Sequence, residues 1–71
     1  MTNELLTKAR ETIPVLLKSR REGLGLSVQT LADKCNVQKT TIYRIEAGKF
    51  MPNIELFITI AHHLKIEINI K

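Results

Sequence analysis

Residues 26–48 read LSVQTLADKCNVQKTTIYRIEAG, and this stretch decides the fold. Its first part places apolar residues on one side of a helix over residues 28–35, with Ser27 as a favourable N-cap. These apolar residues are Leu31, Ala32 and Cys35. Asn36 follows at once, and asparagine tolerates the left-handed backbone that a sharp reversal needs. The pattern therefore predicts a short helix that ends in a tight turn.

The second part of the stretch predicts another helix, whose apolar Val37, Ile42 and Ile45 face inwards and which Gly48 can end. At about 100° per residue, its opposite side carries cations, a hydroxyl, a phenol and a small residue, but no acid. That side is formed by Lys39, Thr40, Tyr43, Arg44 and Ala47. Such a face can hydrogen-bond to base edges and phosphates in a DNA major groove. Most charged helix faces are simply solvated, so the face alone leaves both interpretations open.

The positive charge of the chain is concentrated around these two helices. The 71 residues carry a formal net charge of +4. Residues 18–49 contain seven cations and three acids, whereas the rest of the chain has four of each, so the whole excess lies in this region. A basic region concentrated on one motif is typical of a nucleic-acid-binding protein.

A wider pattern of fixed spacings resembles the helix-turn-helix of the Xre family, to which the phage repressors and Cro belong. The pattern is Ser27-x-x-x-Leu31-Ala32, Asn36-Val37, Ile42, Ile45-Glu46-x-Gly48 and Pro52, within residues 13–66. The resemblance implies an all-α fold, a small bundle like the lambda repressor DNA-binding domain. In it, Val28–Cys35 would be the supporting helix and Gln38–Ala47 the recognition helix.

The chain departs from the family at several positions. The family commonly opens the supporting helix with a glutamine that grips a phosphate; this chain has Val28 there, and Gln29 one place later. Asn36 and Lys65 stand where the family usually has glycine, the latter after the fourth helix. The recognition helix starts with Gln38, a weaker N-cap than the usual serine.

The outer face and the resemblance together assign the DNA contacts. We expect base contacts from Lys39, Thr40 and Arg44, because a Lys or Arg bonded to guanine is the commonest specific contact. We expect phosphate contacts from Gln29, Gln38, Tyr43 and Lys49. The resemblance also implies an ion pair between Arg21 and Glu46, the alternative being two ordinary surface charges.

An apolar stripe predicts a first helix from about residue 3 to residue 22. Pro14 interrupts it, and a proline there must kink or break the helix, unless a new helix starts near Thr12. The stripe consists of Leu5, Leu6, Ala9, Ile13, Leu16 and Leu17. Residues 1–11 form an N-terminal extension whose apolar side chains need a cover, and residues 12–64 form the DNA-binding domain.

The C-terminal part predicts a fourth helix and a strand. Asn53 is a suitable N-cap for a helix to about Leu64, and apolar residues wrap about 200° of it, more than one core requires. Residues 65–71 alternate strictly, which predicts a strand with Ile66, Ile68 and Ile70 on one face. Such a strand could pair antiparallel with that of a second subunit, as in HipB-like antitoxin repressors; the alternative is a frayed tail.

Enzyme and metal chemistry are not expected. There is no acid pair at a plausible site and no glycine-rich phosphate loop, so we expect no catalytic residues and no cofactor. Cys35 occupies an apolar position, and the adjacent His62 and His63 project about 100° apart, so no metal site is expected. A single cysteine and the lack of a long apolar segment favour a cytoplasmic protein without a membrane segment.

These observations predict a sequence-specific transcriptional regulator, in particular a repressor, that binds a palindromic operator in double-stranded DNA as a homodimer. The alternative is a protein-interaction module, such as an antitoxin that neutralises a toxin partner, with or without DNA binding.

Overall fold

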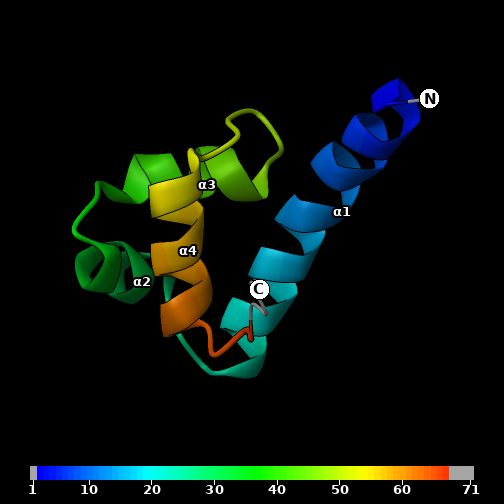
Figure 1. The fold of residues 1–71 in the computed structure, drawn as a ribbon. Helices are drawn as coiled ribbons and strands as arrows, with labels where there is room; N and C mark the ends of the chain where they lie inside the picture. Colours follow the sequence, from blue (N-terminus) through cyan, green and yellow to red (C-terminus); the bar gives the residue numbers. More distant parts are fainter. Residues whose placement is uncertain (1, 68–71) are drawn as a thin grey trace.

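The computed structural model describes residues 2–67 and contains four helices (Figure 1). They are α1 (Thr2–Gly23), α2 (Val28–Cys35), α3 (Lys39–Glu46) and α4 (Ile54–His63). The predicted all-α bundle is confirmed, and α2 has the predicted bounds. The recognition helix is one residue shorter at each end than predicted, because Gln38 and Ala47 are its caps.

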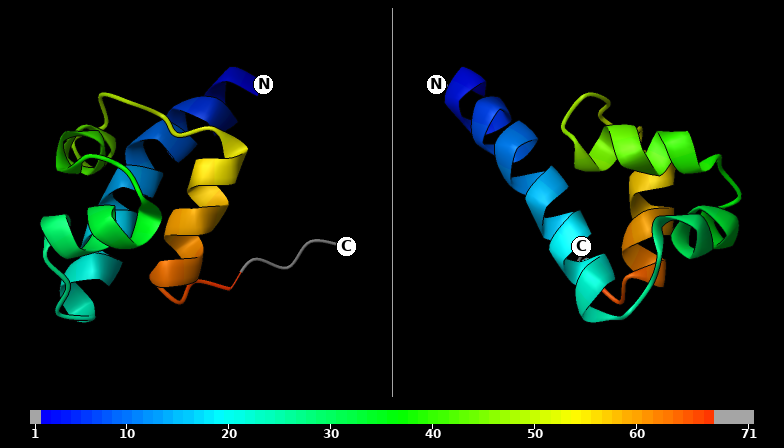
Figure 2. Two further views of the ribbon diagram at one scale, coloured as in Figure 1. Left: turned by 90° about the vertical axis from the view of Figure 1, so that its left-hand side faces the viewer. Right: turned by 180° about the vertical axis from the view of Figure 1, so that it is seen from behind.

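One apolar core holds the four helices together. The largest fully buried side chains come from every helix or its cap: Leu17, Leu31, Ile42, Ile45, Ile60 and Leu64. Burying a side chain of this size contributes about 1.5–3 kcal/mol. Three whole helices, α2, α3 and α4, and the C-terminal half of α1 therefore form one unit around this core, as the ribbon views show (Figures 1 and 2).

The predicted N-caps of α2 and α4 are present. The Ser27 hydroxyl oxygen accepts the backbone N–H of Thr30 at 3.0 Å, and the Asn53 carboxamide oxygen accepts that of Leu56 at 2.8 Å. Gln38 makes no side-chain hydrogen bond to α3, as expected of a weak cap. A capped helix start is worth about 1 kcal/mol, so α2 and α4 are better fixed locally than α3.

Each of the four helices ends in the same hydrogen-bonded reversal. One residue adopts a left-handed backbone, and the N–H of the next residue bonds to the carbonyl five positions earlier, which satisfies an otherwise orphaned acceptor. The left-handed residues are Gly25, Asn36, Gly48 and Lys65, with φ of 72°, 58°, 75° and 59°. Lysine is poorly suited to this conformation, so the end of α4 carries backbone strain that glycine would relieve.

Pro14 does not break the first helix. α1 runs continuously from Thr2 to Gly23, with Pro14 buried inside it. The N-terminal half of α1 extends beyond the other helices in Figures 1 and 2. As a result the predicted apolar stripe is only partly covered: Leu17 is buried, but Leu5 and Leu6 remain 72% and 54% exposed.

The chain after α4 is fixed to the end of α1. The Arg20 guanidinium donates from Nε to the carbonyl of Leu64 (3.0 Å) and from Nη2 to that of Lys65 (3.2 Å). Arginine at a helix C-terminus also complements the negative end of the helix dipole. The side chain of Ile66 packs against the core of its own chain.

The predicted strand over residues 65–71 is not seen within residues 2–67. The expectation that it starts at Lys65 was wrong, because Lys65 ends α4 in the left-handed conformation. Ile68 and Ile70 lie outside the described residues. Among the helices of the described part, none is long and apolar enough to cross a membrane.

Candidate nucleic-acid interface

α3 is anchored by one face and exposes the other. Ile42 and Ile45 are each 1% exposed, because α2 and α1 pack against this side of the helix. The side chains on the opposite side are exposed along its whole length: Lys39, Thr40, Tyr43, Arg44 and Ala47. The three predicted base-contacting residues therefore share one free surface on a helix that the core holds in place.

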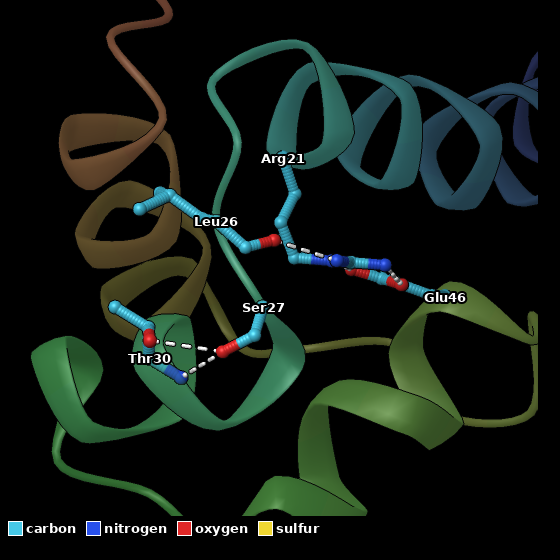
Figure 3. A network of polar contacts seen from close by, with 5 residues as sticks. All are labelled: Arg21, Leu26, Ser27, Thr30 and Glu46. Carbon is cyan, nitrogen blue, oxygen red and sulfur yellow. Dashed lines mark hydrogen bonds and ion pairs between the residues drawn. The ribbon is translucent and has the colours of Figure 1, made fainter.

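Arg21 and Glu46 form a two-point ion pair between α1 and the end of α3 (Figure 3). Arg21 donates from Nε to Oε2 at 2.7 Å and from Nη2 to Oε1 at 3.0 Å. Its Nη1 donates to the carbonyl of Leu26 at 2.8 Å, which adds the α1–α2 loop to the network. The hydrogen bonds that Arg21 donates to the Glu46 carboxylate raise the pKa of Arg21 above its ordinary value. The pair is mostly buried, with side-chain exposures of 10% and 7%.

This ion pair has an electrostatic consequence for the exposed face of α3. Glu46 is the only acid in α3, and an unpaired carboxylate there would repel DNA phosphates. Because both of its oxygens accept hydrogen bonds from Arg21, its charge is compensated within the protein. The exposed face is left with the cations Lys39 and Arg44 and no free acid.

The predicted phosphate-contacting residues lie at several places around this face, and all are exposed. Gln38 directly precedes α3, Tyr43 lies on it, and Lys49 follows its terminal turn. Gln29 lies on α2, where its amide Nε2 donates to Asp33 at 2.9 Å. One of its two amide hydrogens is thus already engaged, and beside an acid Gln29 is a weaker phosphate ligand than the other three.

The structure adds Lys18, which the sequence analysis did not assign to the site. Lys18 lines a hollow between α1, α2 and α3 together with Tyr43 and Ala47, directly beside the Arg21–Glu46 pair. Val28 also lines this hollow, at the place where the resemblance had implied a phosphate-gripping glutamine. The signal was available in the sequence: Lys18 precedes Arg21 by three residues and therefore shares its side of α1.

No metal or nucleophile site accompanies this surface in the part of the chain that the structure describes. Within residues 2–67, no group of three or more His, Cys, Asp or Glu side chains gathers as metal ligands would. Cys35 is a buried core residue, and burial raises the pKa of its thiol, which disfavours the reactive thiolate. The adjacent His62 and His63 contact each other edge to face, with ring centres 5.2 Å apart.

Comparison with known proteins gives one family match. A sequence model of a family described as helix-turn-helix matches residues 17–70, about three quarters of the chain; the match includes α2, α3 and α4 but only residues 17–23 of α1. Comparisons with curated proteins and with solved structures found no match.

Proposed function

Because this chain belongs to the Xre-like helix-turn-helix family of DNA-binding regulators, we propose that it binds a palindromic operator as a homodimer and represses transcription by occupying it. The observation that carries this proposal is the exposed, acid-free face of α3, held on a buried core. A helix anchored in this way can enter a major groove without losing the contacts that position it.

In this proposal the exposed face of α3 contacts the bases. Arg44 and Lys39 carry donors suited to the guanine O6 and N7 acceptors, and the Thr40 hydroxyl can donate or accept. One good bidentate pair discriminates against a wrong base by about 1–3 kcal/mol. Sequence preference would therefore rest on few positions in each half-site.

The surrounding residues would hold the DNA backbone. Gln38 and Lys49 flank the base-contacting residues along the chain, Tyr43 lies among them directly before Arg44, and Lys18 adds a cation from α1. Gln29 completes this set with its remaining amide hydrogen. Contacts of this kind set the register of the protein on the duplex and supply affinity that is independent of sequence.

Dimer formation through the C-terminal segment is the second part of the proposal. The alternating residues that follow Lys65 can pair antiparallel with their copy across a two-fold axis, and the exposed Ile54 and Ile58 of α4 offer further apolar surface. A two-fold dimer places its recognition helices about 34 Å apart, on successive major grooves. The operator should then be a near-palindrome.

A protein-interaction role, such as toxin neutralisation, is the competing proposal. It is favoured by the large apolar side chains that remain exposed on two helices, Leu5, Leu6, Val15 and Leu16 on α1 and Ile54 and Ile58 on α4. The two roles are compatible within one chain, because these side chains are distinct from the exposed face of α3.

A gel-shift titration with random-sequence duplex at two salt concentrations separates the two proposals. A DNA-binding regulator should shift the duplex and bind it far more weakly at the higher salt concentration, because each neutralised phosphate releases counterions. A chain that acts only through a protein partner should leave the duplex unshifted at both salt concentrations, and that result would overturn the DNA-binding proposal. Arg44→Glu reverses a charge on the exposed face of α3. In the same titration this variant should bind the duplex more weakly than wild type does.

A further inference from the structure

A small hollow lies where α1 meets the turn that ends α3. One wall is formed by Arg10, Ile13 and Pro14, and the other mainly by residues 48–52 of the α3–α4 loop. The two walls are in contact, because Pro14 is buried and a Cβ atom added to Gly48 would lie 3.7 Å from its Cγ. Figures 1 and 2 show this loop extending towards α1. The α1 wall precedes residue 17, where the family match begins, so the hollow is a feature that this chain adds to the family domain.

The rim of this hollow carries two cations and no acid. Arg10 and Lys49 both line the hollow, both side chains are exposed, and no Asp or Glu is among the lining residues. Within residues 2–67, no carboxylate forms an ion pair with either cation. Two like charges at one hollow repel each other, and a bound anion removes that repulsion. The hollow is therefore suited to an anion.

Apolar side chains beside these cations strengthen the attraction. Phe50 and Met51 line the same hollow, together with Ile13 of α1. A concave surface that carries one sign of charge on apolar walls concentrates the electric field and attracts ligands of the opposite charge. An anion at this hollow therefore meets a stronger field than it would beside the same two cations on an open helix face.

Arg10 belongs to the side of α1 that faces α3. Pro14, Leu17 and Arg21 follow it at spacings of four, three and four residues, and these positions fall within about 60° around the helix. All three are buried, whereas Arg10, at the next position towards the N-terminus, is exposed. Its guanidinium thus lies at the edge of the packed domain, on the side that holds the recognition helix.

We propose that Arg10 binds a DNA phosphate next to the one that Lys49 binds. This inference rests on the proposed DNA binding, in which Lys49 follows the recognition helix and holds the backbone beside it. A duplex seated on the exposed face of α3 then has the same strand within reach of both cations. The planar guanidinium can donate two hydrogen bonds to phosphate oxygens, and a contact of this kind adds affinity without sequence preference.

The Arg10 contact extends the part of α1 that holds the DNA backbone. Lys18, the other cation proposed on α1, lines the separate hollow that contains Tyr43 and Ala47. It follows Arg10 by eight residues, which is about 12 Å along the helix axis. The two cations therefore contact the backbone at separate points, and the N-terminal half of α1 helps to set the register of the protein on the duplex.

A gel-shift titration with random-sequence duplex at several salt concentrations tests the contribution of Arg10. Arg10→Ala should flatten the plot of log affinity against log salt by about one unit, so that a fourfold rise in salt weakens the variant about 3.5-fold less than wild type. Arg10→Lys keeps the charge and should retain the wild-type slope. The matched control is Lys8→Ala, which removes an exposed cation turned about 160° away from Arg10 on the same helix and should also retain that slope.

The outcomes of this titration separate the inference from the proposed function. Equal slopes for wild type and Arg10→Ala, when wild type binds the duplex, would overturn the inference and leave the proposed function intact. Equal flattening by Arg10→Ala and Lys8→Ala would reveal an effect of net charge and would also overturn it. A wild-type chain that leaves the duplex unshifted would overturn the proposed function, and the inference with it.

The double variant Arg10→Ala/Lys49→Ala tests whether the two cations bind separate phosphates. Its salt slope should be flatter than that of wild type by about two units, the sum of two independent contacts. A slope no flatter than that of Lys49→Ala alone would mean that both cations neutralise one phosphate, and would contradict the assignment of Arg10 to a neighbouring phosphate.

Discussion

Arg21 and Glu46 face each other with two parallel hydrogen bonds of 2.7 and 3.0 Å, and both side chains are about nine-tenths buried. The contact ties α1 to the end of α3 and compensates the only acid of that helix. One pair thus fixes the position of the recognition helix and keeps its exposed side free of uncompensated negative charge.

Removing the acid of this pair should be more costly than removing a surface charge. Glu46→Ala leaves the buried Arg21 with only the carbonyl of Leu26 as a partner, and the free energy of unfolding should fall by about 3–5 kcal/mol. Glu22→Ala, which removes an exposed acid one residue beyond Arg21 on α1, should cost at most about 1 kcal/mol. Urea unfolding of the two variants, compared at equal slope, measures both losses. If Glu46→Ala and Glu22→Ala have the same midpoint, the Arg21–Glu46 pair contributes no more to stability than an exposed charge does.

The strained end of α4 should be improvable. Lys65→Gly removes a side chain from a residue with φ of 59° and should raise the free energy of unfolding by about 0.5–1 kcal/mol. Lys34→Gly makes the same chemical change inside the last turn of α2, where the backbone is helical, and should lower it by about the same amount. Thermal unfolding of both variants provides the comparison. A loss of stability in Lys65→Gly would mean that the left-handed lysine carries no strain.

Lys49 should contribute affinity without sequence preference. Lys49→Ala removes one proposed phosphate contact, so the plot of log affinity against log salt should flatten by about one unit, for every duplex tested. Lys34→Ala removes an exposed cation that lines a different hollow, with His62 and Lys65, and should leave the slope unchanged. Identical slopes for wild type and Lys49→Ala would remove Lys49 from the interface.

The C-terminal segment should hold the operator-binding dimer. Deletion of residues 68–71 should convert a dimer into a monomer. This deletion retains Ile66, which packs on the core of its own chain. Affinity for a full operator should fall, while weak half-site binding remains. Glu67→Gln, with every isoleucine retained, should stay dimeric.

Two sedimentation results would contradict the strand-paired dimer. One is a chain of all 71 residues that is already monomeric. The other is a dimer that survives the deletion of residues 68–71.

Much of the fold could be predicted from the sequence because it rests on local chemistry. The caps Ser27 and Asn53 and the reversal at Asn36 are where their side chains predicted them. The pairing of Arg21 with Glu46 needed the family pattern as well, because twenty-five residues separate the two. The free face of α3 followed from periodicity alone.

Other features depend on tertiary packing and could not be predicted in this way. Pro14 sits inside a continuous helix, although its own geometry favours a break. The apolar stripe of α1 did not show which leucines the domain covers, since that depends on where α1 extends past the other helices. Arg20 binds carbonyls that are forty-four and forty-five residues away, and no local pattern indicates such a contact.

Selection of bound sequences from a random DNA pool tests most directly whether α3 contacts the bases of a two-fold operator. Wild type should enrich a near-palindrome with half-sites about 34 Å apart along the duplex. Arg44→Ala should bind its best site about 1–3 kcal/mol more weakly and lose the preference at one symmetric position of each half-site. A pool without an enriched sequence, or matching profiles for wild type and Arg44→Ala, would contradict the account.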